Sequence, residues 1–294
     1  MKQLFCLLIF ICQFAYAQEN NILERLQALD NNGKIWFNID GYSITSEEFK
    51  FNFDEKGIKK ILNKHGIKND SRVKDENIKF NNYYFLETNK LTDNITQYNS
   101  YYIVENQNKK ISAIWFAKTG KTDKETEVLL TNMILENKIP KENFATMEIG
   151  TINFGGRKID LGSSCYWTFL NTVQCPYFGE MNWSVHRDLQ DAKNAIENQL
   201  ALTKSKKAGK VIAEELVDIE FEDTPTVAKK VTYEITGITG ALTGLSGGKT
   251  LTIYYVAEKI RGNYMSCVLS FWNNDQINPE TQLPPLLEKV MKLK

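Results

Sequence analysis

Ile253–Trp272 reads IYYVAEKIRGNYMSCVLSFW, two strand-like runs joined by a short turn. The same order occurs earlier in the chain at Ser100–Ala117, which reads SYYIVENQNKKISAIWFA. When the two stretches are aligned letter by letter, Ser112 falls on Ser266 and the second turn contains one extra residue. We interpret the pair as a duplication, because only two copies are found and a solenoid usually needs three or more.

The segments around the two hairpins repeat as well. A strand and a helix precede each hairpin, at Phe51–Leu62 and at Asn182–Leu200, and Asp188 can cap the second of these helices. A helix is also expected after each hairpin, over Asp123–Asn137 in the first copy and up to the C-terminus in the second. Apolar residues at helical spacing predict one further helix over Gln18–Asp30.

These elements predict two modules whose boundary falls near Met147–Gly156. The chain length agrees with two modules, because a domain has typically about 150 residues. The predicted organisation is a signal peptide at residues 1–17, a first α/β module at residues 18–147, and a second α/β module with a cysteine loop at residues 148–294.

The layout of each half resembles the Mog1/PsbP-like α/β/α sandwich, in its Tyr-Tyr strand, its hairpin and the helix that closes it. The second half, about Gly155–Lys294, also resembles uncharacterised exported bacterial proteins with a Cys-Pro…Gly-Glu-Met-Asn-Trp-Ser core, here Cys175–Ser184. The sandwich resemblance implies an α+β fold in which each module is a mostly antiparallel sheet flanked by helices. It also implies binding or accessory work rather than catalysis.

The N-terminus has the features of a secretory signal. Lys2 supplies a positive charge, Leu4–Phe14 is an apolar run too short to span a bilayer, and Ala15-Tyr16-Ala17 matches the cleavage pattern before Gln18. We therefore expect export to a periplasm or the extracellular space. No later segment approaches the roughly 20 apolar residues of a membrane helix, so no integral membrane segment is expected.

The charge balance argues against a polyanionic partner. The chain has 36 basic and 36 acidic residues and no long basic block, so no nucleic-acid partner is expected. A hydrophobic content of 42% is enough to build two cores. The sequence leaves the oligomeric state open.

Three cysteines remain after removal of the signal: Cys165, Cys175 and Cys267. In an oxidising compartment the favoured pairing is Cys165 with Cys175, which closes a loop and contributes roughly 2–3 kcal/mol. Cys267 lies within a strand and is expected to be buried. The alternatives for the cysteine loop are free thiols, a metal site or a catalytic Cys-His pair with His186. The spacing matches no zinc pattern, so no metal is predicted.

A glycine-rich stretch, Thr243–Thr250, approaches the phosphate-binding loop pattern but fails it. Thr243 stands where the first glycine is needed, and Leu251–Ala257 continues as a strand rather than as the required helix. We interpret Gly237–Lys249 as a long hairpin loop, and we expect no nucleotide or other cofactor.

The candidate binding residues, with no catalytic residue assigned, are Tyr177, Trp183, His186, Gly244 and Lys249. For the aromatic residues around the disulfide, core packing is the favoured interpretation, and an exposed platform for a partner is the alternative. The favoured interpretation is an exported, non-catalytic binding or accessory protein that recognises another protein through its second module. The alternative is a secreted hydrolase or thiol-dependent enzyme that uses Cys175 or Cys267 with His186.

Overall fold

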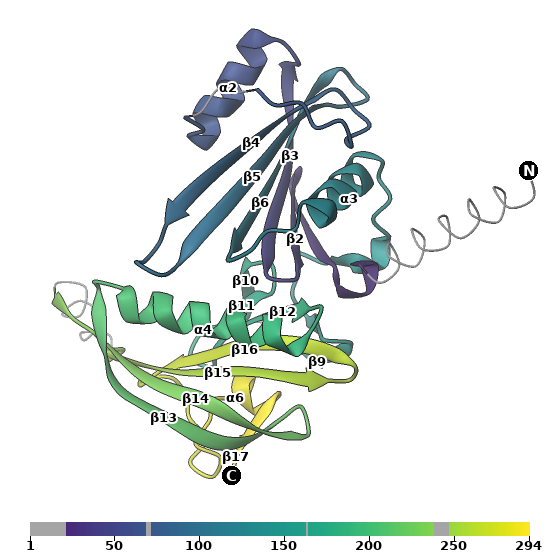
Figure 1. Cartoon of the computed structure of the whole chain (residues 1–294). Helices are drawn as coiled ribbons and strands as arrows, with labels where there is room; N and C mark the ends of the chain where they lie inside the picture. The colour runs from purple at the N-terminus through teal and green to yellow at the C-terminus, as the bar shows by residue number, and fades with distance from the viewer. Residues whose placement is uncertain (1–21, 69–71, 163, 238–246) are drawn as a thin grey trace, which may run out of the picture.

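The computed structural model describes residues 22–68, 72–162, 164–237 and 247–294. Two large β-sheets form two modules, and the first lies above the second in Figure 1. Helices pack against both sheets, and the prediction of a two-module α+β fold is confirmed. No helix among these residues is long and apolar enough to cross a membrane.

The first sheet has the strand order β4-β5-β6-β3-β2-β1-β7. All neighbouring strands are antiparallel except β1 and β7, which are parallel. Its elements are β1 (Gln27–Asn31), β2 (Lys34–Ile39), β3 (Tyr42–Asn52), α2 (Glu55–His65), β4 (Asn82–Lys90), β5 (Thr96–Glu105), β6 (Lys110–Thr119), α3 (Lys124–Leu135), a 3-10 turn (Lys141–Asn143) and β7 (Phe144–Ala145).

The second sheet has the order β10-β11-β12-β16-β15-β14-β13-β17, and all its pairs are antiparallel. A separate hairpin of β8 (Thr151–Phe154) and β9 (Arg157–Asp160) packs on its core. The remaining elements are β10 (Tyr166–Phe169), β11 (Thr172–Cys175), β12 (Gly179–His186), α4 (Leu189–Ser205), β13 (Gly209–Phe221), β14 (Thr224–Ile235), β15 (Thr250–Ile260), β16 (Asn263–Trp272), α6 (Pro285–Glu288) and β17 (Met291–Leu293).

Local capping explains where the longer helices begin. The Asp123 carboxylate accepts a hydrogen bond from Thr126 N at 3.1 Å at the start of α3, and Asp188 accepts one from Asp191 N at 2.8 Å at the start of α4. Each bond satisfies a backbone donor that the first helical turn leaves without a partner. The observed α3 ends lie within two residues of the prediction.

Two predicted helices are wrong at their ends. Of Gln18–Asp30, the described part is helical only at Ile22–Arg25, because from Gln27 onward the chain pairs with β2 as a strand. A turn at Asn32-Gly33 with positive φ closes that hairpin. At the C-terminus, α6 has only four residues, and β17 then pairs with β13.

Equivalent strands have the same order in the two sheets: β3, β6, β5 and β4 in the first, and β12, β16, β15 and β14 in the second. Helix α2 follows β3 and packs on the face of Tyr101, whereas α4 follows β12 and packs on the face of Tyr255. The letter-by-letter alignment instead matches Tyr101 with Tyr254, which faces the core beside α6. That alignment is therefore wrong by one residue, which moves every side chain to the other face. Ser112 and Ser266 accordingly lie on faces covered by different helices, α3 and α4.

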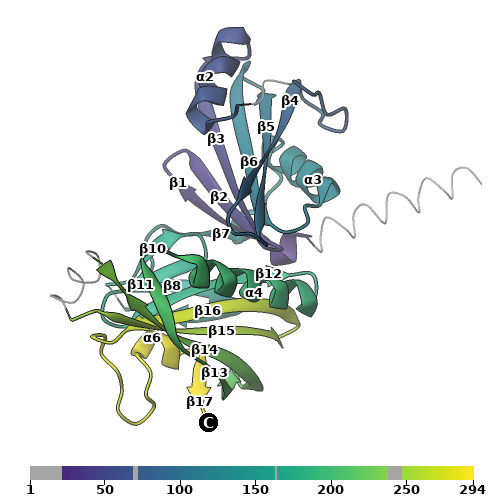
Figure 2. The ribbon, with the colours of Figure 1, turned by 60° about the vertical axis from the view of Figure 1, so that its left-hand side comes forward.

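The two modules touch where the β2–β3 turn meets the end of β12. Helix α4 lies on the side of the second sheet that faces the first module (Figures 1 and 2). Asp40 N donates to Val185 O at 2.9 Å, and the buried Asp40 carboxylate pairs with Arg25 at 2.9 Å and Arg187 at 3.1 Å. Arg187 also forms an ion pair with Asp123 at the start of α3. A carboxylate shared by arginines from both modules therefore joins them.

Candidate functional site

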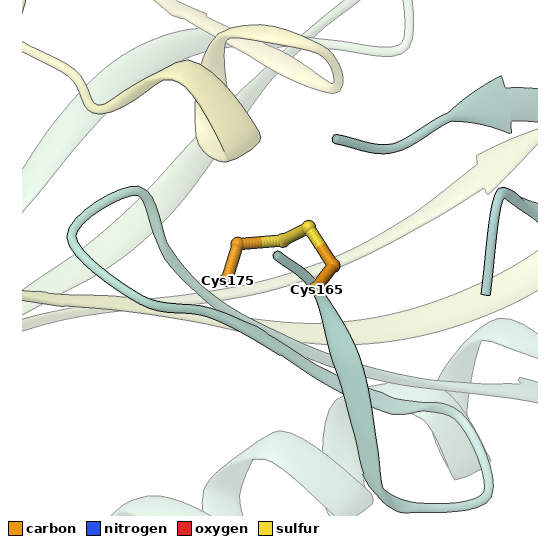
Figure 3. The surroundings of a disulfide bond; sticks show 2 residues. All are labelled: Cys165 and Cys175. Carbon is orange, nitrogen blue, oxygen red and sulfur yellow. A yellow bond between two sulfur atoms is a disulfide. The ribbon is translucent and has the colours of Figure 1, made fainter. Parts of the chain in front are cut away.

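A disulfide joins Cys165 and Cys175, as predicted, with their Cα atoms 4.1 Å apart (Figure 3). The bond ties the chain just before β10 to the end of β11, and the turn that leads into β12 follows it directly. Phe178 N donates to Cys175 O at 2.8 Å and closes this turn. The covalent bond and the hydrogen bond together fix the backbone around Tyr177.

Tyr177 is the most prominent side chain of this turn, with 61% of its surface exposed. Its φ is 65°, a left-handed conformation that costs a residue other than glycine on the order of 1–3 kcal/mol. Tyr177 O accepts a hydrogen bond from Gln276 N at 2.8 Å, which anchors the turn to the segment after β16. The fold therefore holds an exposed aromatic ring on a strained and well-supported backbone.

A cavity of about 230 Å³ lies beside Tyr177, and we call it the Tyr177 pocket. It is bounded by the turn after β11 and by the ends of β12, β15 and β16. Its lining residues are Gln174, Cys175, Pro176, Tyr177, Gly179, Glu180, Leu251, Ser270, Trp272, Asn274 and Asp275. The pocket thus combines two aromatic side chains, two carboxyl groups and several amide or hydroxyl groups, and none of its described lining residues is basic.

The two carboxyl groups of the Tyr177 pocket are partly removed from water. Burial raises the pKa of Glu180, an effect opposed by the nearby charge of Lys206. Burial also raises the pKa of Asp275, whose carboxylate accepts a hydrogen bond from Trp272 N at 2.8 Å. No described residue forms an ion pair or a side-chain hydrogen bond with Glu180.

The base of the glycine-rich loop lies at the same end of the module. A Cβ placed on Gly248 would lie 3.0 Å from the Asn274 side chain, and Asn274 lines the Tyr177 pocket. Lys249 forms an ion pair with Glu234 at 2.9 Å. The structure therefore brings Tyr177 and Lys249 to one end of the second module, while Gly244 lies outside the described residues.

Trp183 and His186 lie away from this end, and neither side chain is accessible. Trp183 is 1% exposed and packs against Phe154 and Trp167, with ring centroids at 5.4 and 6.1 Å, so the core-packing interpretation is the correct one. His186 is 2% exposed at the end of β12 nearest the first module. The predicted set of five residues therefore does not form a single surface.

Neither cysteine of the enzyme alternative offers an accessible thiol. Cys175 is in the disulfide, and Cys267 is a free but buried cysteine of the second core. Burial raises the pKa of the Cys267 thiol well above its usual value, which disfavours the reactive thiolate. Because side chains alternate along β16, Cys267 points away from the face on which Ser266 meets His186.

A larger cleft of about 400 Å³ lies between the modules. His186 Nε2 and Ser266 Oγ are hydrogen-bonded there at 2.8 Å, and burial lowers the pKa of His186 to about 4. No hydrogen bond joins the His186 ring to a described carboxylate, so the pair lacks the acid that orients histidine in a catalytic triad. Burial also lowers the pKa of Lys118, whose Nζ lies 4.5 Å from the centre of the Tyr42 ring.

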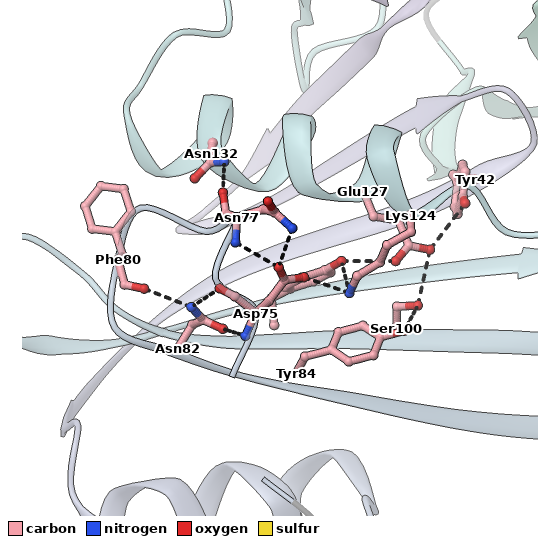
Figure 4. Close-up of polar contacts among 11 residues, drawn as sticks. Tyr42, Asp75, Asn77, Phe80, Asn82, Tyr84, Ser100, Lys124, Glu127 and Asn132 are labelled. Carbon is pink, nitrogen blue, oxygen red and sulfur yellow. Dashed lines mark hydrogen bonds and ion pairs between the residues drawn. The ribbon is translucent and has the colours of Figure 1, made fainter. Parts of the chain in front are cut away.

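A buried carboxylate in the first module was not predicted. Glu127 on α3 accepts hydrogen bonds of 3.2 Å from the hydroxyls of Tyr42, Ser100 and Tyr102 (Figure 4). Lys124 donates to the Tyr102 hydroxyl at 2.8 Å. These donors satisfy the carboxylate within the fold, which indicates a structural role. Its sequence signal is its position three residues before Leu130, on the apolar stripe of the helix.

No group of histidine, cysteine and acidic side chains suited to a metal ion occurs within the described parts of the chain.

Comparison with known proteins gives little further information. No family model matches the chain, and no curated protein matches its sequence. Among solved structures, the chain shows 9% identity and a TM-score of 0.23 with the Tle4-Tli4 complex, over 91% of this chain and 97% of that one. With DynU16, a putative protein of the dynemicin biosynthetic locus, the identity is 6% and the TM-score 0.18, over 87% and 79% of the chains. These scores do not establish a shared fold, and the Mog1/PsbP-like resemblance stays a prediction.

Proposed function

We propose that this chain is an exported, non-catalytic binding protein that recognises another protein through its second module, at the Tyr177 pocket. The observation that carries the proposal is the exposed Tyr177 ring on a turn fixed by the disulfide, directly beside a concave site that contains Trp272. Rigid aromatic residues next to a pocket are typical of the few positions that supply most of the binding energy in protein interfaces.

The alternative enzyme has less support from the geometry. Cys175 is bonded to Cys165, Cys267 is buried, and His186 is neutral and enclosed between the modules. A thiol mechanism needs an accessible thiolate and a base within hydrogen-bond reach. The Tyr177 pocket needs neither to bind a partner.

The proposal is tested by capture from an envelope extract, followed by reconstitution of the purified pair. Tyr177→Asn removes the ring but keeps a residue that tolerates positive φ. We expect it to weaken the reconstituted complex by about 30-fold, as loss of an interface hot spot does. Leu216→Asn is the matched control, because Leu216 is 70% exposed on β13 outside the pocket.

Equal affinity of wild type and Tyr177→Asn for every reconstituted partner would contradict the proposal. Capture alone is not support, since the loss must be specific to Tyr177 and absent from the Leu216 control. Thermal melting of both variants checks that each one is folded.

A further inference from the structure

The Tyr177 pocket contains two acidic side chains. Glu180 and Asp275 come from different segments, β12 and the turn after β16, and both line the same cavity. Removing a carboxylate from water is costly unless a cation or a hydrogen-bond donor compensates it. Asp275 has a backbone donor, Trp272 N, whereas Glu180 has no such bond to a described residue.

The pocket is also lined by two aromatic residues. Tyr177 and Trp272 both belong to its lining. The negative face of a tyrosine or tryptophan ring attracts a cation, and this attraction strengthens when water is excluded. The carboxyl groups and the aromatic residues of the pocket therefore both favour a positively charged ligand.

Two described lysines near this pocket, Lys249 and Lys206, form no ion pair with its acidic side chains. Lys249 pairs with Glu234 at 2.9 Å, outside the lining of the pocket. Lys206, beside the end of α4, acts on Glu180 through its charge but forms no ion pair with it. No described residue of this chain therefore forms an ion pair with Glu180, and only the more distant charge of Lys206 opposes the effect of its burial.

We infer that the Tyr177 pocket takes a basic side chain, a lysine ammonium or an arginine guanidinium, presented by the protein partner. This inference rests on the proposed function and adds the chemistry of the recognised residue. An acidic group is excluded by repulsion from Glu180 and Asp275. An uncharged apolar group would cover Glu180 without compensating it, which leaves the desolvation cost in place.

The test is an NMR titration of the complete chain, with its disulfide formed, against four small probes of matched size. These are the Nα-acetyl amides of arginine, lysine, norleucine and glutamate. We expect saturable shifts of the Trp272 indole N–H with the arginine and lysine probes only. Added salt should weaken the binding, because the pocket is partly open to solvent.

Substitutions in the pocket test which side chains bind the arginine probe. Glu180→Gln combined with Asp275→Asn should weaken binding of the arginine probe at least about tenfold, as removal of paired charges does. Lys206→Gln should strengthen it, because it removes a competing positive charge near Glu180. Glu215→Gln is the control, since Glu215 lies on β13 and pairs with Lys230 at 2.8 Å.

Equal binding of the norleucine probe, no binding of any probe, or an unchanged affinity in the double carboxyl variant would each overturn the inference. None of these results bears on the dependence of partner capture on Tyr177, so the proposed function is tested separately. If Tyr177→Asn abolishes the complex and the double carboxyl variant does not, the function stands and the basic side chain is excluded.

Discussion

Each module encloses a buried titratable side chain beside its sheet, and the two are held in different ways. Glu127 is 1% exposed and accepts hydrogen bonds from three hydroxyls, whereas His186 is hydrogen-bonded to the single hydroxyl of Ser266. Burial is the largest cause of both pKa shifts, since it raises the pKa of Glu127 and lowers that of His186 to about 4. In both modules, desolvation favours the neutral form.

The same cause gives Glu127 and His186 opposite contributions to the pH dependence of stability. Because the folded pKa of Glu127 is raised, its contribution to stability is complete below its unfolded pKa of about 4.3 and is lost as the pH rises. Because the folded pKa of His186 is lowered, its contribution is complete above about pH 6.5 and is lost as the pH falls towards 4. Whether the buried group is an acid or a base therefore decides whether its contribution to stability is lost as the pH rises or as the pH falls.

The largest loss of stability is expected when the Glu127 carboxylate of the first module is removed. Glu127→Ala leaves the hydroxyls of Tyr42, Ser100 and Tyr102 without their acceptor and opens a cavity in the core. We expect a loss of about 4 kcal/mol in the free energy of unfolding, measured by urea denaturation. The control is Glu125→Ala, an exposed residue of the same helix. An equal loss in both variants would show that the cluster is not structural.

His186 should make the second module sensitive to acid. A shift from 6.5 to about 4 corresponds to a loss of about 3 kcal/mol of stability between pH 7 and pH 4. In His186→Gln this part of the pH dependence should disappear, while an amide still reaches Ser266. Denaturation curves at several pH values measure the difference between the variant and the wild type. A difference that does not change with pH would contradict the assignment.

The disulfide is a further difference between the modules, because it lies in the second one. A bond between Cys165 and Cys175 should contribute roughly 2–3 kcal/mol, and no cysteine remains in the first module once residues 1–17 are set aside. Replacing both by serine should lower stability by that amount and speed hydrogen exchange in β10–β12. Exchange in β5 and β6 of the first module should not change. Faster exchange in both modules would mean that they unfold as one unit.

Local signals in the sequence predicted much of the fold. A capping box of Thr122 and Glu125 and the apolar residues after it located α3, although the observed N-cap is Asp123, one residue later. The spacing of Cys165 and Cys175 located the disulfide. Each of these features depends on residues close in sequence. The repeated order of elements was also visible, and the equivalent strands have the same order in the two sheets.

The sequence alignment did not correctly predict which face of its strand each side chain occupies. Matching letters placed Ser112 on Ser266, but a single residue decides which side of a strand a side chain occupies. The part of β12 from Met181 to His186 shows the same point, because apolar and polar residues alternate along it. That alternation already separates Trp183 from His186, and it could have shown that they do not share a surface.

The pocket itself could not be predicted from neighbouring residues. Glu180 lies about 70 residues before Leu251 in the sequence, and the pairing of β12 with β16 brings it beside the β15–β16 hairpin and Asp275. The sequence identified Tyr177 as a candidate but gave no reason to group it with two carboxyl groups. Such a site depends on strand register, which was the weakest part of the sequence prediction.

The smallest effect is the most direct test of the opposite pH responses. Glu127→Gln keeps the shape of the side chain and one acceptor oxygen, so it should cost only about 1 kcal/mol near neutral pH. Because the variant cannot ionise, the wild type should gain stability relative to it as the pH falls towards 4. For His186→Gln the wild type should instead lose stability over the same range. Denaturation of the two variants in parallel, at matched ionic strength, gives both slopes, and slopes of the same sign would show that burial does not control both groups.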